Sequence, residues 1–302
     1  MKLSDKRGVL WALGTALISG VSVYVNKYGV AQVKDPFVYT TVKNSIVAVG
    51  FLVALGFFAS WRELRAFTPR QWAGWIALGL IGGGIPFLLF FQGLALASAP
   101  SAALIHKTLF LWVALLAVPL LGERLGGWQI AGLGVLVAGQ FLLQPPSAWG
   151  WGGGEILILI ATLLWAAETI LAKKVLAGVS AHTAAIGRMG VGALVMWVFL
   201  GLTGRAEGAV TLTGAQWFWV AITAVFLMGY VWTWYQALKV APAALVTSVL
   251  TLGAIITIFL TTLLEATGVT TTQVAATLLM ALGAAAFATR LTWRTPQTAE
   301  AV

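Results

Sequence analysis

The sequence contains no cysteine, and only 9% of its 302 residues are charged. Without cysteine there is no disulfide, no thiolate metal ligand and no thiol nucleophile. Two histidines and nine carboxylates do not favour a protein-built zinc site, so the sequence predicts neither a metal nor another cofactor. Soluble domains carry about 25% charged and roughly 45–50% apolar residues, whereas 60% of this chain is hydrophobic. This composition indicates a membrane protein.

Motifs that would power or catalyse a reaction are also missing. No Gly-rich loop carries Gly-Lys-Ser/Thr, so ATP does not drive the protein directly. There is no His-Glu-x-x-His, no Gly-x-Ser-x-Gly and no paired aspartate within an apolar stretch, which disfavours a membrane-embedded enzyme. The net charge is +9, but the basic residues are scattered one to three at a time, which disfavours nucleic-acid binding.

Apolar stretches separated by polar or Gly/Pro clusters give ten candidate spans. They fall at 8–26, 37–59, 72–97, 101–121, 127–144, 155–172, 182–203, 215–238, 243–264 and 270–289. A membrane helix takes about 20 residues, so ten of them use about 200 and leave no room for a separate catalytic domain. The sequence predicts an all-α polytopic membrane protein, with the first span retained because no signal-peptide cleavage site follows it.

Lysine and arginine are distributed unequally between the predicted loops. With the N-terminus placed in the cytoplasm, only Lys27, Lys34 and Arg205 fall outside. Twelve basic residues fall on the cytoplasmic side: Lys2, Lys6, Arg7, Arg62, Arg65, Arg70, Arg124, Lys173, Lys174, Lys239, Arg290 and Arg294. Because cytoplasmic loops carry an excess of Lys and Arg, the sequence predicts that both termini are cytoplasmic.

The two halves of the chain repeat similar residues at matching positions. Gln71-Trp72 opens the third span and Gln216-Trp217 the eighth, and these spans end in Phe91-Gln92-Gly93-Leu94 and Tyr235-Gln236-Ala237-Leu238. Pro100 and Pro242 follow, and a glutamate comes 23 residues after each, at Glu123 and Glu265. The match divides the chain into repeats 1–150 and 151–302. Since five spans is an odd number, the second copy enters the membrane upside down, as in many secondary transporters.

These residues resemble the EamA repeat of the drug/metabolite transporter superfamily. The resemblance rests on the aromatic-Gln-small-Leu ends, the Pro and small residues after them, and the segment LLGERLGGWQIAGLGVLVAG around Glu123. With 15 Trp and 15 Phe, the chain is most similar to bacterial exporters of aromatic and other neutral amino acids. The resemblance implies ten helices around a central cavity in a bacterial-type inner (plasma) membrane. It also implies that the fifth and tenth helices are peripheral. The second repeat departs from the pattern, because Ala266 replaces the basic residue beside the glutamate.

Helix-breaking residues interrupt the third span. Gly82, Gly83, Gly84 and Pro86 lie in its middle, where proline removes an intrahelical hydrogen bond and glycine allows close approach. Gly83 and Pro86 therefore mark either a hinge that opens and closes the cavity or a static kink with close helix packing.

Two aromatic stripes occupy repeat-related helices. Phe87, Phe90 and Phe91 fall on one face of the third span, and Tyr230, Trp234 and Tyr235 fall on the eighth, while Trp165 adds a ring in the sixth. Each ring could instead pack against lipid or a neighbouring helix. Together the stripes predict cavity walls that would bind an apolar or aromatic side chain.

Polar side chains within the spans are costly in a bilayer, so each needs a partner or a purpose. Gln92 and Gln236 occupy matching sites at the ends of the stripes. His106 and Lys107 lie roughly 10 Å deep in the fourth span at about 1.5 Å per residue, where the ninth has Ser248 and Val249. Lys107 either counters a substrate carboxylate or extends to the headgroups. His106 either orients substrate or relays protons, or it makes a structural helix contact.

Charged residues deeper in the spans are expected to pair. Glu168 in the sixth span and Arg188 in the seventh lie at similar depth, which predicts an ion pair that is either structural or proton-exchanging. Lys43 has no acid in its own span, and its nearest candidate partners in sequence are Asn44 and Asp35. Glu123 and Glu265, both at span ends, are interpreted as helix-terminal or gate contacts.

The leading hypothesis is a secondary transporter that exports small amphipathic metabolites, most of all aromatic and other neutral amino acids, by alternating access. Its partners are a small-molecule substrate and the lipid bilayer. The alternatives are a drug or other metabolite carrier of the same superfamily, a membrane-embedded enzyme, and a non-transporting scaffold. A nucleotide-sugar carrier is disfavoured because only Lys43, Lys107 and Arg188 are available within spans to bind phosphates.

Overall fold

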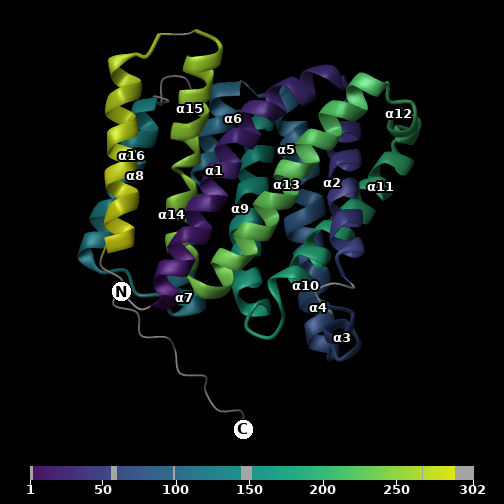
Figure 1. The fold of residues 1–302 in the computed structure, drawn as a ribbon, viewed down its shortest axis with the longest axis horizontal. Helices are drawn as coiled ribbons and strands as arrows, with labels where there is room; N and C mark the ends of the chain where they lie inside the picture. Colours follow the sequence, from purple (N-terminus) through teal and green to yellow (C-terminus); the bar gives the residue numbers. More distant parts are fainter. Residues whose placement is uncertain (1–2, 56–59, 98, 144–151, 267, 290–302) are drawn as a thin grey trace.

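The computed structural model describes residues 3–55, 60–97, 99–143, 152–266 and 268–289, and within these ranges it contains helices and loops but no strand (Figure 1). The repeat boundary at 150/151 and the basic residues Lys2, Arg290 and Arg294 lie outside the described residues. In chain order the elements are α1 (Leu3–Gln32), α2 (Pro36–Val53), α3 (Ser60–Arg65), α4 (Pro69–Leu78), η1 (Gly79–Gly84), α5 (Ile85–Leu96), α6 (Ala99–Lys107), α7 (Leu109–Leu121), α8 (Gly127–Leu143), α9 (Gly153–Val175), α10 (Ala181–Ile186), η3 (Gly187–Val191), α11 (Gly192–Leu202), α12 (Ala206–Val210), α13 (Gly214–Val240), α14 (Ala243–Leu250), α15 (Gly253–Leu264) and α16 (Thr271–Thr289).

Eight helical segments of the described chain are long and apolar enough to cross a bilayer. They are Lys6–Gln32, Pro36–Val53, Pro69–Leu96, Ser101–Leu121, Gly153–Val175, Ala181–Leu202, Gly214–Val240 and Ala243–Leu264. These correspond to eight of the ten spans expected from the sequence. The other two, Gly127–Leu143 and Thr271–Phe287, are apolar but shorter, so the count of ten stays a prediction.

The starts of the long helices are fixed by hydrogen bonds from side chains. Thr68 and Gln71 form a reciprocal capping box at the start of α4, and Thr213 and Gln216 form the same box at the start of α13. Such boxes satisfy backbone N–H groups that lack an intrahelical partner. Gln71 and Gln216, which open the third and eighth spans in the sequence, therefore have the same capping role in both helices.

Four of the spans are not continuous α-helices. The span from Pro69 passes through the π-helical turn η1 before Pro86, and the span from Ala181 passes through the π-helical turn η3. The fourth span breaks at Thr108 between α6 and α7, and the ninth breaks between α14 and α15. At both breaks a threonine hydroxyl donates to the carbonyl three residues earlier, Thr108 to Ile105 and Thr251 to Ser248, each at 2.6 Å.

The two π-helical turns pack directly against each other through glycine. A Cβ added at Gly83 would overlap with the backbone oxygen of Arg188, and one added at Gly192 would overlap with the backbone of Gly83. Larger residues at these positions would force the two helices apart. This fixed close contact is compatible with the kink interpretation of Gly83 and gives Pro86 a rigid position at the start of α5.

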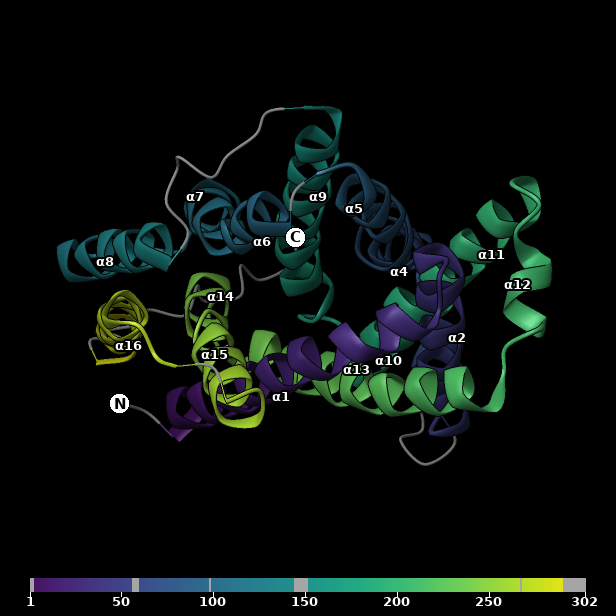
Figure 2. The same ribbon diagram turned by 90° about the horizontal axis from the view of Figure 1, so that it is seen from above.

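The helices enclose a central region from several sides (Figure 2). α1 lies along α13, α5 lies along α9, and α14 and α15 pack on α1. α8 and α16 pack on each other at one edge of the bundle, where Gly132, Gly139 and Gly283 allow close approach. The fifth and tenth apolar helices, α8 and α16, are thus peripheral, and the other apolar helices surround the central region.

Candidate functional site

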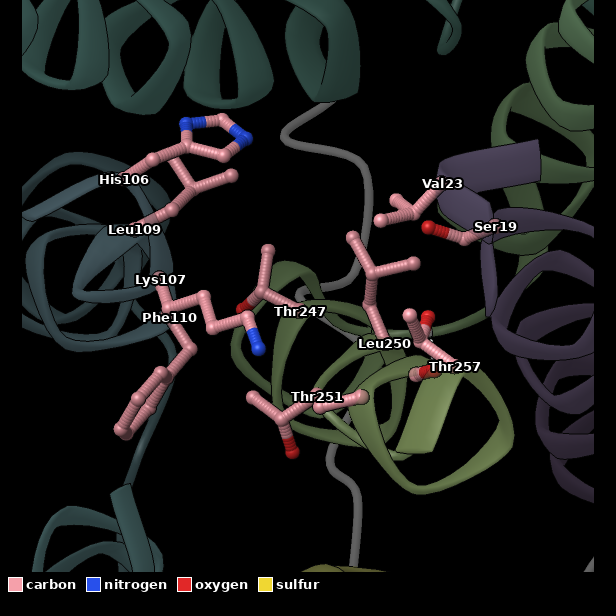
Figure 3. Close-up of a pocket in the computed structure, with 12 residues that line it drawn as sticks. Ser19, Val23, His106, Lys107, Leu109, Phe110, Thr247, Leu250, Thr251 and Thr257 are labelled. Atoms are coloured by element: carbon pink, nitrogen blue, oxygen red, sulfur yellow. Dashed lines mark hydrogen bonds between the residues drawn. The ribbon is translucent and has the colours of Figure 1, made fainter. Parts of the chain in front are cut away.

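A cavity of about 150 Å³ lies where the two broken helices face each other. Its lining comes from α1, from the α6–α7 break and from α14–α15: Ser19, Val23, His106, Lys107, Leu109, Phe110, Thr247, Leu250, Thr251, Gly253, Ala254 and Thr257 (Figure 3). A single water needs roughly 10–15 Å³ by this kind of measure, so the cavity has room for a small solute. Two of the predicted site residues, His106 and Lys107, line it.

Lys107 extends from the α6–α7 break into this cavity, toward Thr247 and Thr251 on the opposite side (Figure 3). Among the residues that the structure describes, none of the ion pairs involves Lys107. A lysine inside a membrane span without an acidic partner is costly, so its charge requires either water or an anion in the cavity.

Pro86 explains the position of Trp165. Because proline has no N–H, it cannot donate to the carbonyl of Gly82 four residues earlier. The indole N–H of Trp165 donates to that carbonyl oxygen at 3.0 Å. Trp165 is therefore held in a fixed orientation by the same kink that the sequence suggested as a hinge.

Three rings from α5 and α6 surround Trp165 of α9. Its ring centroid lies 5.3 Å from that of Phe87, 5.5 Å from that of Phe90 and 4.9 Å from that of His106. Edge contacts of this kind are favourable beyond the area they bury. Since His106 also lines the cavity, this aromatic cluster adjoins it. Phe91 contacts the ring of Phe90 but is itself buried in the core formed with α2 and α11.

The second stripe forms a separate group on α13. The rings of Tyr230 and Trp234 stack at 6.0 Å, and Tyr235 and Trp234 are fully buried. Among the described residues, no ring contact joins these three side chains to the Trp165 cluster. Gln92 is exposed and Gln236 is half-buried, and neither lines the cavity.

Glu168 is the centre of a buried polar group. Tyr235 donates its hydroxyl hydrogen to Glu168 Oε1 at 2.6 Å, and Arg188 Nη1 lies 3.8 Å from Glu168 Oε2. The side chain of Glu168 also lies against Gly82, where a Cβ would overlap with it. The pair expected from the sequence is thus in place, and the phenol that was assigned to the cavity wall instead contacts the carboxylate.

The loop after α7 binds the start of α14. Glu123 accepts hydrogen bonds from the N–H groups of Ala243 at 2.7 Å and Ala244 at 3.1 Å, and only 5% of it is exposed. Lys173 at the end of α9 donates to the carbonyls of Leu238 and Ala241 at 2.5 and 2.6 Å. Burial raises the pKa of Glu123, although the two N–H groups and Lys173 act in the opposite direction. These bonds join α7 and α9 to α13 and α14, and we call this end of the bundle the Glu123 end.

At the other end of the α14–α15 span, Glu265 follows α15 and makes a more exposed contact. Glu265 accepts a hydrogen bond from Lys27 of α1 at 2.6 Å, and both side chains are partly exposed. The Lys27 ammonium lowers the pKa of Glu265. This bond joins α1 to α15, which already pack together, so it does not link opposite sides of the cavity.

Lys43 pairs with neither residue proposed from the sequence, and that prediction is wrong. Its ammonium donates to Asn26 Oδ1 at 3.1 Å and lies 4.7 Å from the ring centroid of Tyr39. Asp35 instead caps α2 and pairs with Arg205 at 3.0 Å. Residues near Lys43 in the sequence were the wrong candidates because its partner, Asn26, comes from a different helix, α1.

Several cavity residues were not singled out in the sequence. Ser19, Thr247, Thr251 and Thr257 supply its hydroxyl groups. Single Ser and Thr residues are common in membrane helices, where they bond to their own backbone. A usable signal was the alignment of Pro100 with Pro242, which places Thr108 and Thr251 eight and nine residues downstream.

Comparison with known proteins adds the family. The model of the EamA-like transporter family matches residues 6–144 and 152–289. This chain belongs to the EamA-like transporter family. It is 27% identical over 133 residues to an uncharacterized transporter encoded in the cobO 3′ region of a Sinorhizobium species, a match that covers 44% of this chain and 93% of that protein.

Two further matches extend over more of the chain. The uncharacterized transporter YyaM of Bacillus subtilis (strain 168) is 25% identical over 235 residues, which cover 75% of this chain and 76% of that one. A crystal structure with 19% identity matches with a TM-score of 0.72 over 92% of this chain and 95% of its own, which supports the fold. The family and both relatives' names indicate a multi-pass membrane transporter.

Neutralising Glu168 should destabilise this transporter. Glu168→Gln leaves Arg188 as a buried cation without its anion, and we expect a loss of ~3 kcal/mol. Glu168→Gln combined with Arg188→Gln should recover part of that loss, because no unpaired charge remains. Thermal unfolding of the purified variants in detergent measures both effects. Strictly additive losses would contradict an energetic coupling between the two side chains.

Proposed function

We propose that this EamA-family transporter exports small amphipathic metabolites, aromatic and other neutral amino acids first among them, by alternating access. The observation that carries the proposal is the cavity at the two broken helices, which combines a cation with an adjoining aromatic cluster. Discontinuous helices surround substrate sites in many secondary transporters, since irregular backbone inside a membrane is tolerated where it lines a cavity.

The size and chemistry of the cavity support a small solute with one apolar part. The rings of Phe90 and Trp165 lie behind His106, which lines the cavity, Phe87 packs on Trp165, and Lys107 offers a single positive charge. Ligand pockets are lined mostly by apolar groups with a few placed polar ones, and the lining of this smaller cavity has the same character. One cation is too few for a substrate that carries several phosphates.

The hydrogen bonds at the Glu123 end support alternating access. Glu123 and Lys173 hold α7 and α9 against α13 and α14 through four bonds to backbone groups. If these bonds break together with the Tyr235–Glu168 and Lys239–Val179 bonds, α13 and α14 can separate from α7 and α9 at that end while the α1–α13 and α5–α9 pairs stay intact. We propose that this movement opens the cavity toward the cytoplasm. We also propose that the chain is built from two inverted repeats and that both of its termini are cytoplasmic.

The orientation can be tested directly because the chain has no cysteine of its own. Lys34, in the loop after α1, and Arg124, in the loop after α7, are both exposed, and the two loops lie at opposite ends of the bundle (Figure 1). In intact bacterial cells, a membrane-impermeant maleimide should label Lys34→Cys and should label Arg124→Cys only after the membrane is permeabilised. The reverse pattern would place the termini outside and overturn the orientation.

Transport itself is tested in proteoliposomes with labelled Trp, Phe, Met and Thr. We expect saturable flux, and we expect Phe90→Ala or Trp165→Ala to lower kcat/KM for Trp at least about tenfold, since aromatic anchors of a binding site are worth more than about 1.4 kcal/mol. Trp217→Ala is the matched control, because Trp217 lies half-exposed in the first turn of α13. Flux no greater than in empty liposomes for all four amino acids would overturn the amino-acid assignment.

A further inference from the structure

The charge of Lys107 has no anion among the described residues, and the residues facing it have a common property. Thr247, Thr251 and Thr257 line the same cavity. Each already donates its hydroxyl hydrogen to a backbone carbonyl: Thr247 to Ala243 at 2.9 Å, Thr251 to Ser248 at 2.6 Å and Thr257 to Gly20 at 2.9 Å. A hydroxyl oxygen whose hydrogen is engaged can still accept a hydrogen bond.

The cavity therefore offers one strong cationic donor on its α6–α7 side and acceptors on its α14–α15 side (Figure 3). A ligand that satisfies both sides has an anionic group toward Lys107 and a cationic or N–H-donating group toward the threonines.

We propose that Lys107 is the residue that binds the carboxylate of the transported solute. The ammonium group of the solute is then held at Thr247 and Thr251. This deepens the proposed function, on which it rests for the nature of the site. Binding then depends more on the solute's carboxylate than on its ammonium group, and the solute's side chain lies toward His106 and the aromatic cluster behind it. A charge-assisted bond to a carboxylate is among the strongest that such a cavity can form.

Lys107 is not expected to stabilise the fold. Since Lys107 has no anion among the described residues, an uncharged side chain of similar length should be tolerated. Lys107→Met is therefore expected to fold and to unfold at a temperature no lower than the wild type. That property makes it a usable test variant.

The experiment compares three ligands that share the indole ring: tryptophan, indole-3-propionate and tryptamine. Each is added to the purified protein in detergent, and the shift in Tm is measured together with inhibition of labelled tryptophan flux in proteoliposomes. We expect tryptophan and indole-3-propionate to raise Tm and to inhibit flux, and tryptamine to do so at least about tenfold more weakly.

The same ligands are then tested on variants. Lys107→Met should lose at least about tenfold in apparent affinity for the two carboxylates while its response to tryptamine stays the same, and Lys107→Arg should retain part of the preference. Lys174→Met is the matched control, since Lys174 is exposed at the Glu123 end and its loss removes a charge without touching the cavity.

Equal responses of wild type and Lys107→Met to the carboxylates would overturn the assignment, as would stronger binding of tryptamine than of indole-3-propionate. If none of the three indoles raises Tm, the site does not bind indolyl carboxylates and the assignment falls as stated. Carboxylate binding that depends on Lys107 without flux of any amino acid would instead leave the binding assignment standing and overturn the export of amino acids.

Discussion

The backbone groups at an interruption of a membrane-spanning helix must find hydrogen-bond partners, and this constraint organises the whole site. At Pro86 the compensation comes from the indole of Trp165, which donates to the carbonyl of Gly82. At the other two breaks the hydroxyl groups of Thr108 and Thr251 donate to the same carbonyls of their own helix that their backbone N–H groups reach. The interruptions are thus stable, and they bring His106, Lys107 and the threonines of α14 and α15 around one cavity.

The same constraint separates rigid parts from parts that can move. The π-helical turns η1 and η3 are locked by glycine contacts, and Glu168 with Arg188 and Tyr235 lies beside them. By contrast, the Glu123 end is held by hydrogen bonds to backbone groups of α13 and α14, and in the movement that we propose these bonds exchange for water. A carrier requires both properties, because its cavity must keep its shape while one end opens.

The sequence predicted much of the fold because hydrophobic length is a strong signal. Eight of its ten spans correspond to long apolar helices, and the fold agrees with the family match. The two remaining stretches are shorter than a standard span, so length alone does not decide them. Pro86 and its glycines predicted an interruption, but not that a tryptophan from another helix would complete it, since this depends on tertiary packing.

The candidate site was predictable from the sequence only where a charged side chain lies within a membrane span. Lys107 and the pairing of Glu168 with Arg188 followed from the cost of charge in a bilayer. The orientation of Tyr235 and the partner of Lys43 did not, because helical periodicity gives a face and leaves open which neighbour meets it. The breaks at Thr108 and Thr251 have no proline at the break itself, and a threonine that bonds to its own helix is locally indistinguishable from one in a regular helix.

The central claim is that the transported solute occupies the cavity between the broken helices. It is tested most directly by placing a single thiol there, since Thr251→Cys would carry the only cysteine in the chain. The account predicts that a small thiol reagent modifies this cysteine and abolishes flux, and that a transported amino acid slows the modification. Modification at the same rate with and without saturating solute, or full flux after complete modification, would contradict it.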